Sequence, residues 1–191
     1  KSFRPKDDDD DNDSNGWSDF KGKSRKNDTH ASKTDPEAKL MRKGNGKEAK
    51  LSYSAHALME NRNGLLLDFR VAEANGWAER DVAEQMMKSH LRSGSTLGAD
   101  AGYNTRGFVA ACRKQGITPH VAGKARSSAV DGRTTHHATY AASQRVRKRI
   151  EQVFGWLKTV AGLRKSRFKG RARTEAYAVM AGAAYNLLRV A

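Results

Sequence analysis

Apolar and polar residues alternate along residues 48–59, and this two-residue period predicts a β-strand with one apolar face. The apolar face carries Leu51, Tyr53, Ala55, Ala57 and Met59, and the polar face carries Ser52, Ser54 and His56. Asn63-Gly64 follows the strand and favours a tight hairpin turn, because both residues tolerate positive φ. We therefore expect a second, antiparallel strand over residues 65–71. His56 lies on the polar face and needs no catalytic explanation.

The remainder of the chain alternates between helical and strand-like patterns. Apolar stripes with helical spacing predict helices over residues 78–91, 107–115, 143–160 and 174–190. Short apolar runs predict strands over 96–100 and 117–121, with a polar loop over 123–140. This order of elements indicates a mixed α/β domain over residues 48–191.

Residues 1–47 have a different composition. Asp7 to Asp11 are five consecutive acids, and such runs repel themselves and usually stay unfolded. Asp35 and Glu37 flank Pro36, a pattern typical of a helix start. We expect residues 1–47 to form a flexible, mostly irregular segment.

Positive charge is concentrated in one part of the sequence. The 191 residues include 36 Lys and Arg against 21 Asp and Glu, a formal net charge of +15. Between Lys124 and Arg173 there are 14 basic residues and only two acids, Asp131 and Glu151. A field this concentrated attracts polyanions such as nucleic acid, although a solvated surface is the simpler alternative.

Several classes of protein are excluded by what the sequence lacks. No apolar run approaches the ~18 residues that a membrane span needs. The single Cys112 excludes an internal disulfide and a cysteine-based zinc cluster, and it fits a reducing cytosol. The first residues are polar and acidic, unlike a secretory signal, and the sequence starts at Lys1 without Met. We expect a cytoplasmic fragment of a longer protein.

Two carboxylates are candidates for chemistry. Glu151 shares one face of the helix predicted over 143–160 with Arg147 and Lys158, while the apolar residues occupy another face. Ordinary i,i+4 pairing between Arg147 and Glu151 would also explain this pattern. Asp100 ends a predicted buried strand, where α/β sheets commonly hold ligands. If the two acids meet in space, they could share a hard divalent cation and take part in phosphoryl chemistry.

Two motifs carry a resemblance to a known family. Gly98-Ala99-Asp100-Ala101-Gly102-Tyr103 resembles the second-aspartate motif of bacterial insertion-sequence DDE transposases, the transposase DDE domain family. The stretch from Arg147 through Glu151 to Lys158 resembles their glutamate signature, with Gln144 where the family often has Tyr. Shorter blocks of the same family are similar to residues 34–38, 61–64 and 119–122.

The resemblance implies a fold and a metal centre. It implies a ribonuclease H-like mixed sheet flanked by helices and lacking its first strand, because the strand that carries the family's first aspartate would precede Lys1. Asp100, Glu151 and that missing aspartate would hold Mg²⁺ or Mn²⁺. Asp7 to Asp11 are poor substitutes, because metal ligands need a fixed and supported geometry.

The resemblance also implies partners and a reaction. The complete protein would cut transposon ends and join the freed 3′-hydroxyl to target DNA, whereas this fragment alone would be inactive. Arg147 and Lys158 would contact DNA phosphates beside the metals. A further row of basic residues would extend the grip on the DNA backbone without reading bases: Arg164, Lys165, Arg167, Lys169, Arg171 and Arg173.

Two alternatives remain open from the sequence. The chain could be a non-enzymatic DNA-binding remnant of a transposase, or a nuclease of the same fold without strand transfer. In each case we expect a nucleoid-associated cytoplasmic protein with no membrane contact and the possibility of a homo-oligomer.

Overall fold

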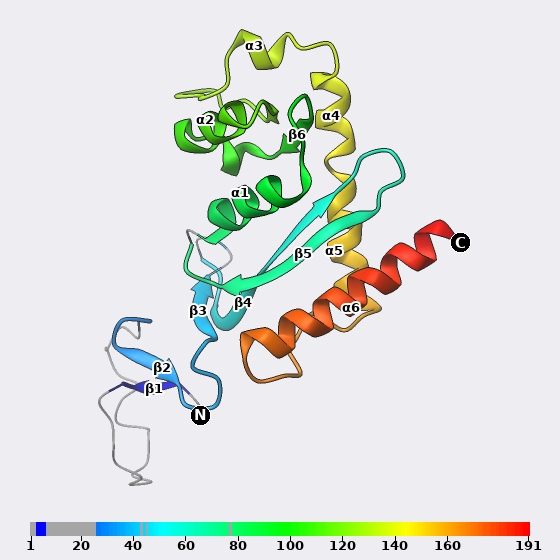
Figure 1. Ribbon diagram of the computed structural model, residues 1–191. Helices are drawn as coiled ribbons and strands as arrows, with labels where there is room; N and C mark the ends of the chain where they lie inside the picture. Colours follow the sequence, from blue (N-terminus) through cyan, green and yellow to red (C-terminus); the bar gives the residue numbers. More distant parts are fainter. Residues whose placement is uncertain (1–2, 7–25, 43, 45, 77) are drawn as a thin grey trace, which may run out of the picture.

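The computed structural model (Figure 1) describes residues 3–6, 26–42, 44, 46–76 and 78–191. The strands are β1 (Phe3–Pro5), β2 (His30–Ser32), β3 (Lys39–Arg42), β4 (Ala49–Met59), β5 (Leu66–Glu73), β6 (Thr96–Ala99) and β7 (Thr118–Val121). The α-helices are α1 (Ala78–His90), α2 (Arg106–Lys114), α3 (Gly132–Thr135), α4 (Tyr140–Val146), α5 (Arg149–Thr159) and α6 (Arg171–Val190). A 3₁₀ turn, η2 (Ala101–Tyr103), follows β6. The mixed α/β class predicted from the sequence is confirmed.

The sheet is divided into separate parts. β3, β4 and β5 form an antiparallel sheet in which Tyr53 lies opposite Glu73, and β6 pairs with β7 in parallel with Leu97 opposite Pro119. β1 and β2 form a third, two-stranded pair. Within the described residues no strand pairing joins β4 to β6. The single mixed sheet implied by the resemblance is therefore present as two sheets that helices hold together.

Helices cover both faces of the β4–β5 hairpin. Phe69 and Val71 of β5 face a core completed by Val153 and Leu157 of α5 and Ala178 of α6. The opposite face carries Asp68 and Arg70 of β5, which contact α1: Asp68 lies 3.0 Å from the His90 ring nitrogen Nε2, and Arg70 donates to Gln85. Because α1 covers this face, His56 is only 7% exposed although it lies on the polar face of its strand.

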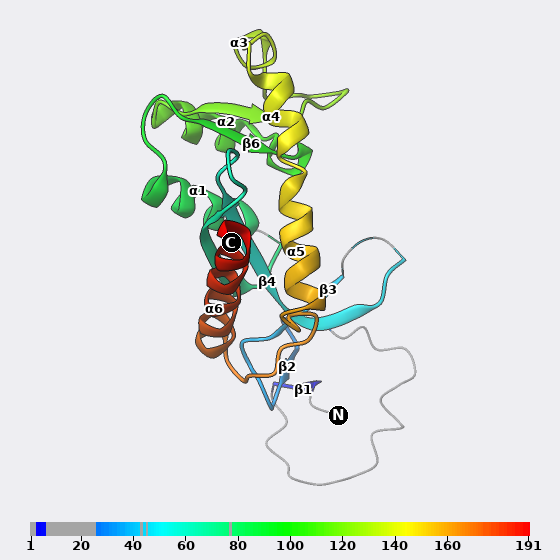
Figure 2. The same ribbon diagram turned by 90° about the vertical axis from the view of Figure 1, so that its right-hand side faces the viewer.

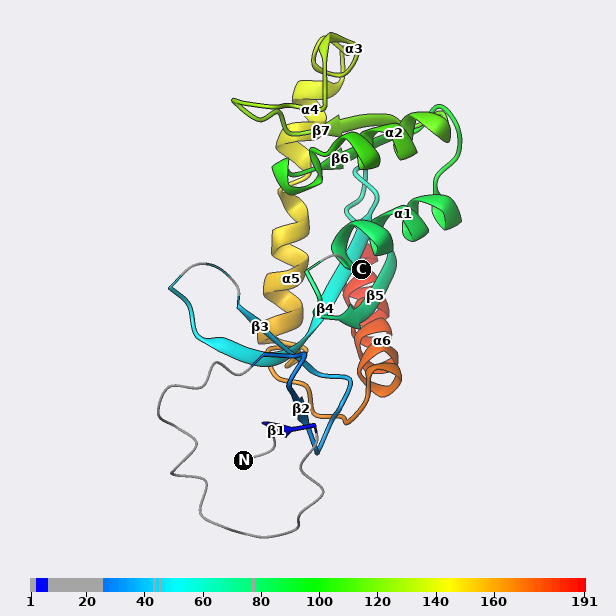
Figure 3. The ribbon, with the colours of Figure 1, turned by 90° about the vertical axis from the view of Figure 1, so that its left-hand side faces the viewer.

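A second core surrounds the β6–β7 pair. It consists of Met87 from α1, Phe108, Val109 and Cys112 from α2, and Ile117, Val121 and Val130 around β7. Figure 2 shows α4 and α5 following nearly one line past both sheets, and Figure 3 shows β6, β7 and α2 gathered at one end of the molecule. The two sheets therefore pack against common helices, but no described strand belongs to both sheets.

The helix predicted over residues 143–160 is interrupted between Val146 and Arg149, within the motif that contains Arg147 and Glu151. Around Arg147 and Lys148 the backbone N–H groups of Ile150 and Glu151 donate three residues back instead of four. This tightened turn separates α4 from α5 and directly precedes Glu151.

The region over residues 1–47 contains more pairing than the sequence predicts. β3 pairs with the first half of β4, and Asp35 and Glu37 do not start a helix. The Asp35 carboxylate instead accepts from the Tyr53 hydroxyl at 2.7 Å, and Glu37 Oε2 accepts the Arg171 backbone N–H at the start of α6. Asp35 and Glu37 thus accept hydrogen bonds from β4 and α6, and local sequence patterns do not reveal these contacts. The acidic run Asp7 to Asp11 lies outside the described residues.

Gly116 is required by the turn between α2 and β7. Its φ is +69°, and a Cβ added there would lie 2.2 Å from Ser93 Oγ. We expect Gly116→Ala to lower the free energy of unfolding by about 1–3 kcal/mol, measured by urea denaturation. Gly107 of α2 has no atom within 4 Å of the equivalent position. Gly107→Ala is the matched control and should leave stability unchanged or raise it, because Ala favours helix; equal losses in both variants would contradict this account.

Candidate functional site

A cleft of about 560 Å³ lies between the two sheets, and we call it the acid cleft. Its walls are residues 55–61 along β4, residues 95–100 along β6, and parts of α1 and α5. Asp100 and Glu151, which the sequence predicts as the catalytic and metal-binding pair, both line it. The fold therefore brings together two acids that are distant in the sequence.

Asp100 is held in place by the turn that follows it. It comes directly after β6 in extended conformation and caps η2, with the Gly102 backbone N–H donating to its Oδ1 at 2.7 Å. A Cβ at Gly102 would lie 2.9 Å from that oxygen, so glycine allows the carboxylate to sit over the turn. The Asp100 side chain is exposed to solvent and lies at the carboxyl end of β6.

Glu151 and Arg147 enter the acid cleft from the junction of α4 and α5. Glu151 is exposed in the first turn of α5, and Arg147 is half-buried. Arg147 Nε donates to Gln144 Oε1 at 2.8 Å, while Gln144 Nε2 donates to the backbone carbonyl of His120 in β7. Gln144, where the resemblance leads one to expect Tyr, therefore orients the arginine.

The acid cleft is also lined by titratable residues that the sequence did not single out for chemistry, among them His56, Glu60 and Glu79. Glu60 accepts backbone N–H groups from Arg62 and Asn63, both at 2.7 Å. Burial raises the pKa of Glu60, but these bonds outweigh it and hold that pKa below its usual range. Glu60 therefore stabilises the β4–β5 turn, a role that the Asn-Gly turn signal could have suggested.

The acid cleft holds an incomplete set of metal ligands. In the parts of the chain that the structure describes, no group of three or more His, Cys, Asp or Glu side chains could hold a metal ion. Asp100 and Glu151 supply two carboxylates, the hard oxygen ligands that Mg²⁺ and Mn²⁺ prefer. By themselves these residues do not fit a two-metal centre.

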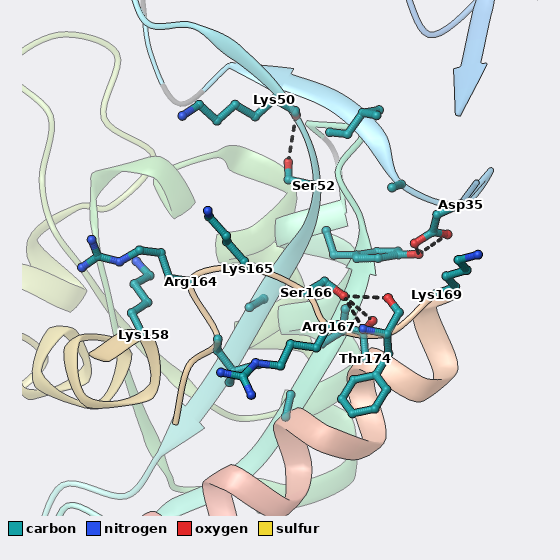
Figure 4. Close-up of a pocket in the computed structure, with 18 of the residues that line it drawn as sticks. Asp35, Lys50, Ser52, Lys158, Arg164, Lys165, Ser166, Arg167, Lys169 and Thr174 are labelled. Atoms are coloured by element: carbon teal, nitrogen blue, oxygen red, sulfur yellow. Dashed lines mark hydrogen bonds between the residues drawn. The ribbon is translucent and has the colours of Figure 1, made fainter. Parts of the chain in front are cut away.

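A second cleft, of about 580 Å³, is strongly basic, and we call it the basic cleft (Figure 4). Six cationic residues line it: Lys50 of β4, Lys158 of α5, and Arg164, Lys165, Arg167 and Lys169 of the loop before α6. The one acid among its described lining residues, Asp35, accepts the Tyr53 hydroxyl. The cleft therefore presents a concentrated positive field to an anion.

The remaining predicted DNA contacts lie outside the basic cleft. Arg171 is half-buried and donates to the backbone carbonyl of Val71 and to Glu175, at 3.4 and 3.3 Å. Arg173 is exposed on α6 and lines neither cleft. We did not predict from the sequence that Lys50 belongs to this basic surface. Its position on the polar face of a strand could have suggested that it is available to an anion.

The two clefts adjoin along β4 and α5. Ala55 and Phe154 line both of them. Arg147 and Glu151 belong to the acid cleft and Lys158, 5.8 Å from the centre of the Phe154 ring, belongs to the basic cleft. The carboxylates and the cations therefore lie in two neighbouring clefts that share the lining residues Ala55 and Phe154.

His120 lies outside both clefts and is buried in the packing of β7 against α4. It is fully buried in β7, its Nδ1 lies 2.8 Å from Ser143 Oγ, and its ring packs against His137. Burial, and secondarily the charge of His137, hold the pKa of His120 below its ordinary value of 6.5. Burial lowers the pKa of His56 in the same way.

The unfolded chain therefore takes up protons on these histidines at a higher pH than the folded chain does. We expect the free energy of unfolding to fall as the pH drops from about 7 towards 5, because the unfolded state binds more protons there. His120→Gln should flatten this dependence, measured by urea denaturation across that range. The exposed His136→Gln is the control, and an equal flattening in that variant would rule out burial of His120 as the cause.

Comparisons with known proteins complete the description of the site. The sequence model of the family described as "Transposase DDE domain" matches residues 17–187. Neither the curated proteins nor the solved structures contain a match. No helix among the described residues has the length and apolar character needed to cross a membrane.

Proposed function

Since this chain belongs to the transposase DDE domain family, we propose that it is the C-terminal catalytic portion of a bacterial insertion-sequence transposase. Family membership implies DNA transposition as the general activity. One observation carries the proposal: Asp100 and Glu151 line the same cleft, and a basic cleft lies next to it. Carboxylates beside a polyanion-binding surface are what metal-assisted phosphodiester chemistry requires.

The acids are the proposed metal ligands of the complete protein. Asp100 and Glu151 would contribute to holding Mg²⁺ or Mn²⁺ together with an aspartate from a strand that precedes Lys1. In this chain the Gly102 N–H orients the carboxylate of Asp100, and the first turn of α5 positions the carboxylate of Glu151. Arg147, fixed by Gln144, is the proposed contact to a phosphate beside them.

The basic cleft is the proposed DNA-backbone surface. Lys158, Arg164, Lys165, Arg167 and Lys169 face it together, and phosphate contacts of this kind position DNA without specifying its sequence. Arg171 is engaged with Val71 and Glu175, so we propose that its main contribution is to the docking of α6. Arg173 would contact DNA beyond the cleft.

The proposed setting is the nucleoid of a bacterial cytoplasm, and the proposed active form is a homo-oligomer. Exposed apolar side chains near the end of α6 support an oligomer: Leu187, Leu188 and Val190 are each at least 65% exposed. Sedimentation analysis of the complete protein on its DNA would test this.

A transposition assay in cells tests the function. The complete reading frame supplies the protein, and its flanking DNA brackets a resistance marker on a donor plasmid. Excision and insertion of the marker into new target DNA are expected. DNA binding without excision would favour the second candidate, a DNA-binding remnant, which the incomplete ligand set supports. Cutting without insertion would favour a nuclease of the same fold.

A further inference from the structure

β3 and the first part of β4 form a two-stranded ribbon that projects from the domain. Lys39 lies opposite Ser52 and Arg42 lies opposite Ala49, and we call residues 39–42, 44 and 46–52 the ribbon. In Figures 2 and 3 the ribbon extends away from the end of α5. No residue of the ribbon belongs to either hydrophobic core. The packing of the domain therefore does not account for its projection.

The tip of the ribbon is narrow and exposed to solvent. A turn closes the tip, and in this turn the Lys47 backbone N–H donates to the Gly44 carbonyl oxygen at 3.2 Å. A Cβ added at Gly44 or at Gly46 would have no atom within 4 Å. Because glycine has no side chain, these positions add nothing to the width of the two backbone strands.

The exposed charged side chains of the ribbon are mainly cationic. Glu48 Oε2 lies 3.3 Å from Lys50 Nζ, and the two side chains are 77% and 72% exposed, so this ion pair is weak. Arg42 and Lys47 are also exposed and belong to none of the ion pairs among the described residues. Lys50 lines the basic cleft as well (Figure 4), so the positive surface of that cleft continues onto the ribbon. A polyanion is the partner that such a surface attracts.

The outer edge of the ribbon is closed to another polypeptide strand. The Asn27 side chain donates from Nδ2 to the Leu40 carbonyl at 2.9 Å and accepts the Leu40 backbone N–H on Oδ1 at 2.7 Å. These two bonds occupy the groups that a further strand would need at this position. Met41, 39% exposed, is the one exposed large hydrophobic side chain among the described ribbon residues. Charge is therefore the main basis on which the ribbon recognises a partner.

We propose that the ribbon enters the major groove of duplex DNA whose backbone lies in the basic cleft. The inference rests on the proposed function, which places DNA in that cleft. A major groove about 12 Å wide admits a two-stranded ribbon, whereas a minor groove about 6 Å wide must first be opened. The four paired residues of each strand extend about 14 Å, which exceeds the major-groove depth of about 8.5 Å. Arg42 and Lys47 are the side chains that contact base edges and the flanking phosphates.

A negative charge at the tip tests the contact in the chain of residues 1–191. Gly44 does not have positive φ, so Gly44→Asp introduces no backbone strain, and it should weaken binding to duplex DNA by about 10-fold. Gly107→Asp is the matched control, because it adds the same charge on α2, where nothing lies within 4 Å of the new Cβ. Its affinity should change by less than about twofold, measured by fluorescence anisotropy. Equal losses in the two variants would assign the effect to net charge and overturn the proposal.

A duplex RNA of the same sequence separates the groove from the backbone. The major groove of A-form RNA is deep and too narrow for a ribbon. Gly44→Asp should therefore weaken binding to this RNA no more than Gly107→Asp does. An equal loss on DNA and RNA would assign the ribbon to phosphates alone and overturn its insertion into the groove.

Chemical footprinting identifies the groove directly in the complete protein on its transposon end. Dimethyl sulfate methylates guanine N7 in the major groove and adenine N3 in the minor groove. Replacing Arg42 and Lys47 together by alanine should restore N7 reactivity at one cluster of protected guanines and leave adenine N3 unchanged. Restored adenine N3 reactivity would place the ribbon in the minor groove and overturn the proposal.

The outcomes separate this proposal from the proposed function. Wild-type DNA binding in Gly44→Asp, together with weakened binding when Lys165, Arg167 and Lys169 are replaced, would overturn the ribbon contact and leave the basic cleft as the DNA surface. Major-groove protection by a protein that does not transpose DNA would establish the ribbon contact and count against the proposed function alone. A wild-type chain that binds no DNA would overturn both.

Discussion

Asp100→Asn and Glu151→Gln, each made in the protein extended upstream of Lys1, will reduce metal-dependent DNA cleavage by about 1,000-fold or more. Each change removes a negative charge and leaves the side chain nearly the same size. Asparagine keeps an Oδ1 that accepts the Gly102 N–H, so η2 keeps its cap. The loss would therefore report chemistry and not folding. The measurements are cleavage of a labelled transposon-end duplex in Mg²⁺ and binding of the same duplex, which should stay unchanged.

Glu60→Gln is the matched control for these two variants. Glu60 lines the same cleft, but its carboxylate accepts the backbone N–H groups of Arg62, Asn63 and Leu65. Removing its charge should weaken the β4–β5 turn and lower the free energy of unfolding by about 1 kcal/mol, with little effect on cleavage at temperatures where the protein is folded. Wild-type cleavage in the Asp100 or the Glu151 variant would remove that residue from the mechanism.

The sequence predicted those elements whose causes are local. The alternation along β4, the turn at Asn63-Gly64 and the apolar stripe of α1 each depend on neighbouring residues, and the structure contains the strand, the helix and a turn at that place. The turn is longer than the predicted tight one: the Glu60 backbone N–H donates to the Leu65 carbonyl, and Gly64 has positive φ whereas Asn63 does not. The place of Asp100 at the end of β6 followed in the same way from a short apolar run that ends in an acid. The sequence thus identified Asp100 by its position at the end of a strand and Glu151 by its position on one face of a helix.

Features that depend on distant residues were not predictable in this way. The alternation of β4 places His56 on the polar face of the strand, but it does not reveal that α1 covers that face and buries the side chain. Glu37 looks like the start of its own helix and instead accepts the first N–H of α6, 134 residues away. The division of the sheet between β4 and β6 depends on which strands pair, and the shared acid cleft depends on how α1 and α5 span that division. No local pattern reveals either arrangement.

Replacing Lys165, Arg167 and Lys169 together by alanine will weaken DNA binding to all sequences alike. These side chains line the basic cleft and have no salt-bridge partner among the described residues, so each is available to a phosphate. Removing one cation that binds a phosphate should reduce the slope of log K against log salt by about 0.9, so the triple variant should reduce that slope by nearly three. Fluorescence anisotropy with two unrelated duplexes over a range of salt concentrations measures both the affinity and the slope.

A second triple variant separates the basic cleft from the overall charge of the protein. Lys88, Arg106 and Lys114 are exposed on α1 and α2 and line neither cleft, and replacing them by alanine removes the same net charge. Long-range attraction alone would weaken binding equally in both triples, because it depends on net charge and falls off with salt screening. Direct contact in the basic cleft requires the larger reduction of slope in the Lys165, Arg167 and Lys169 variant. If only one of the two duplexes lost affinity, the same side chains would be reading bases, and their assignment to the DNA backbone would be wrong.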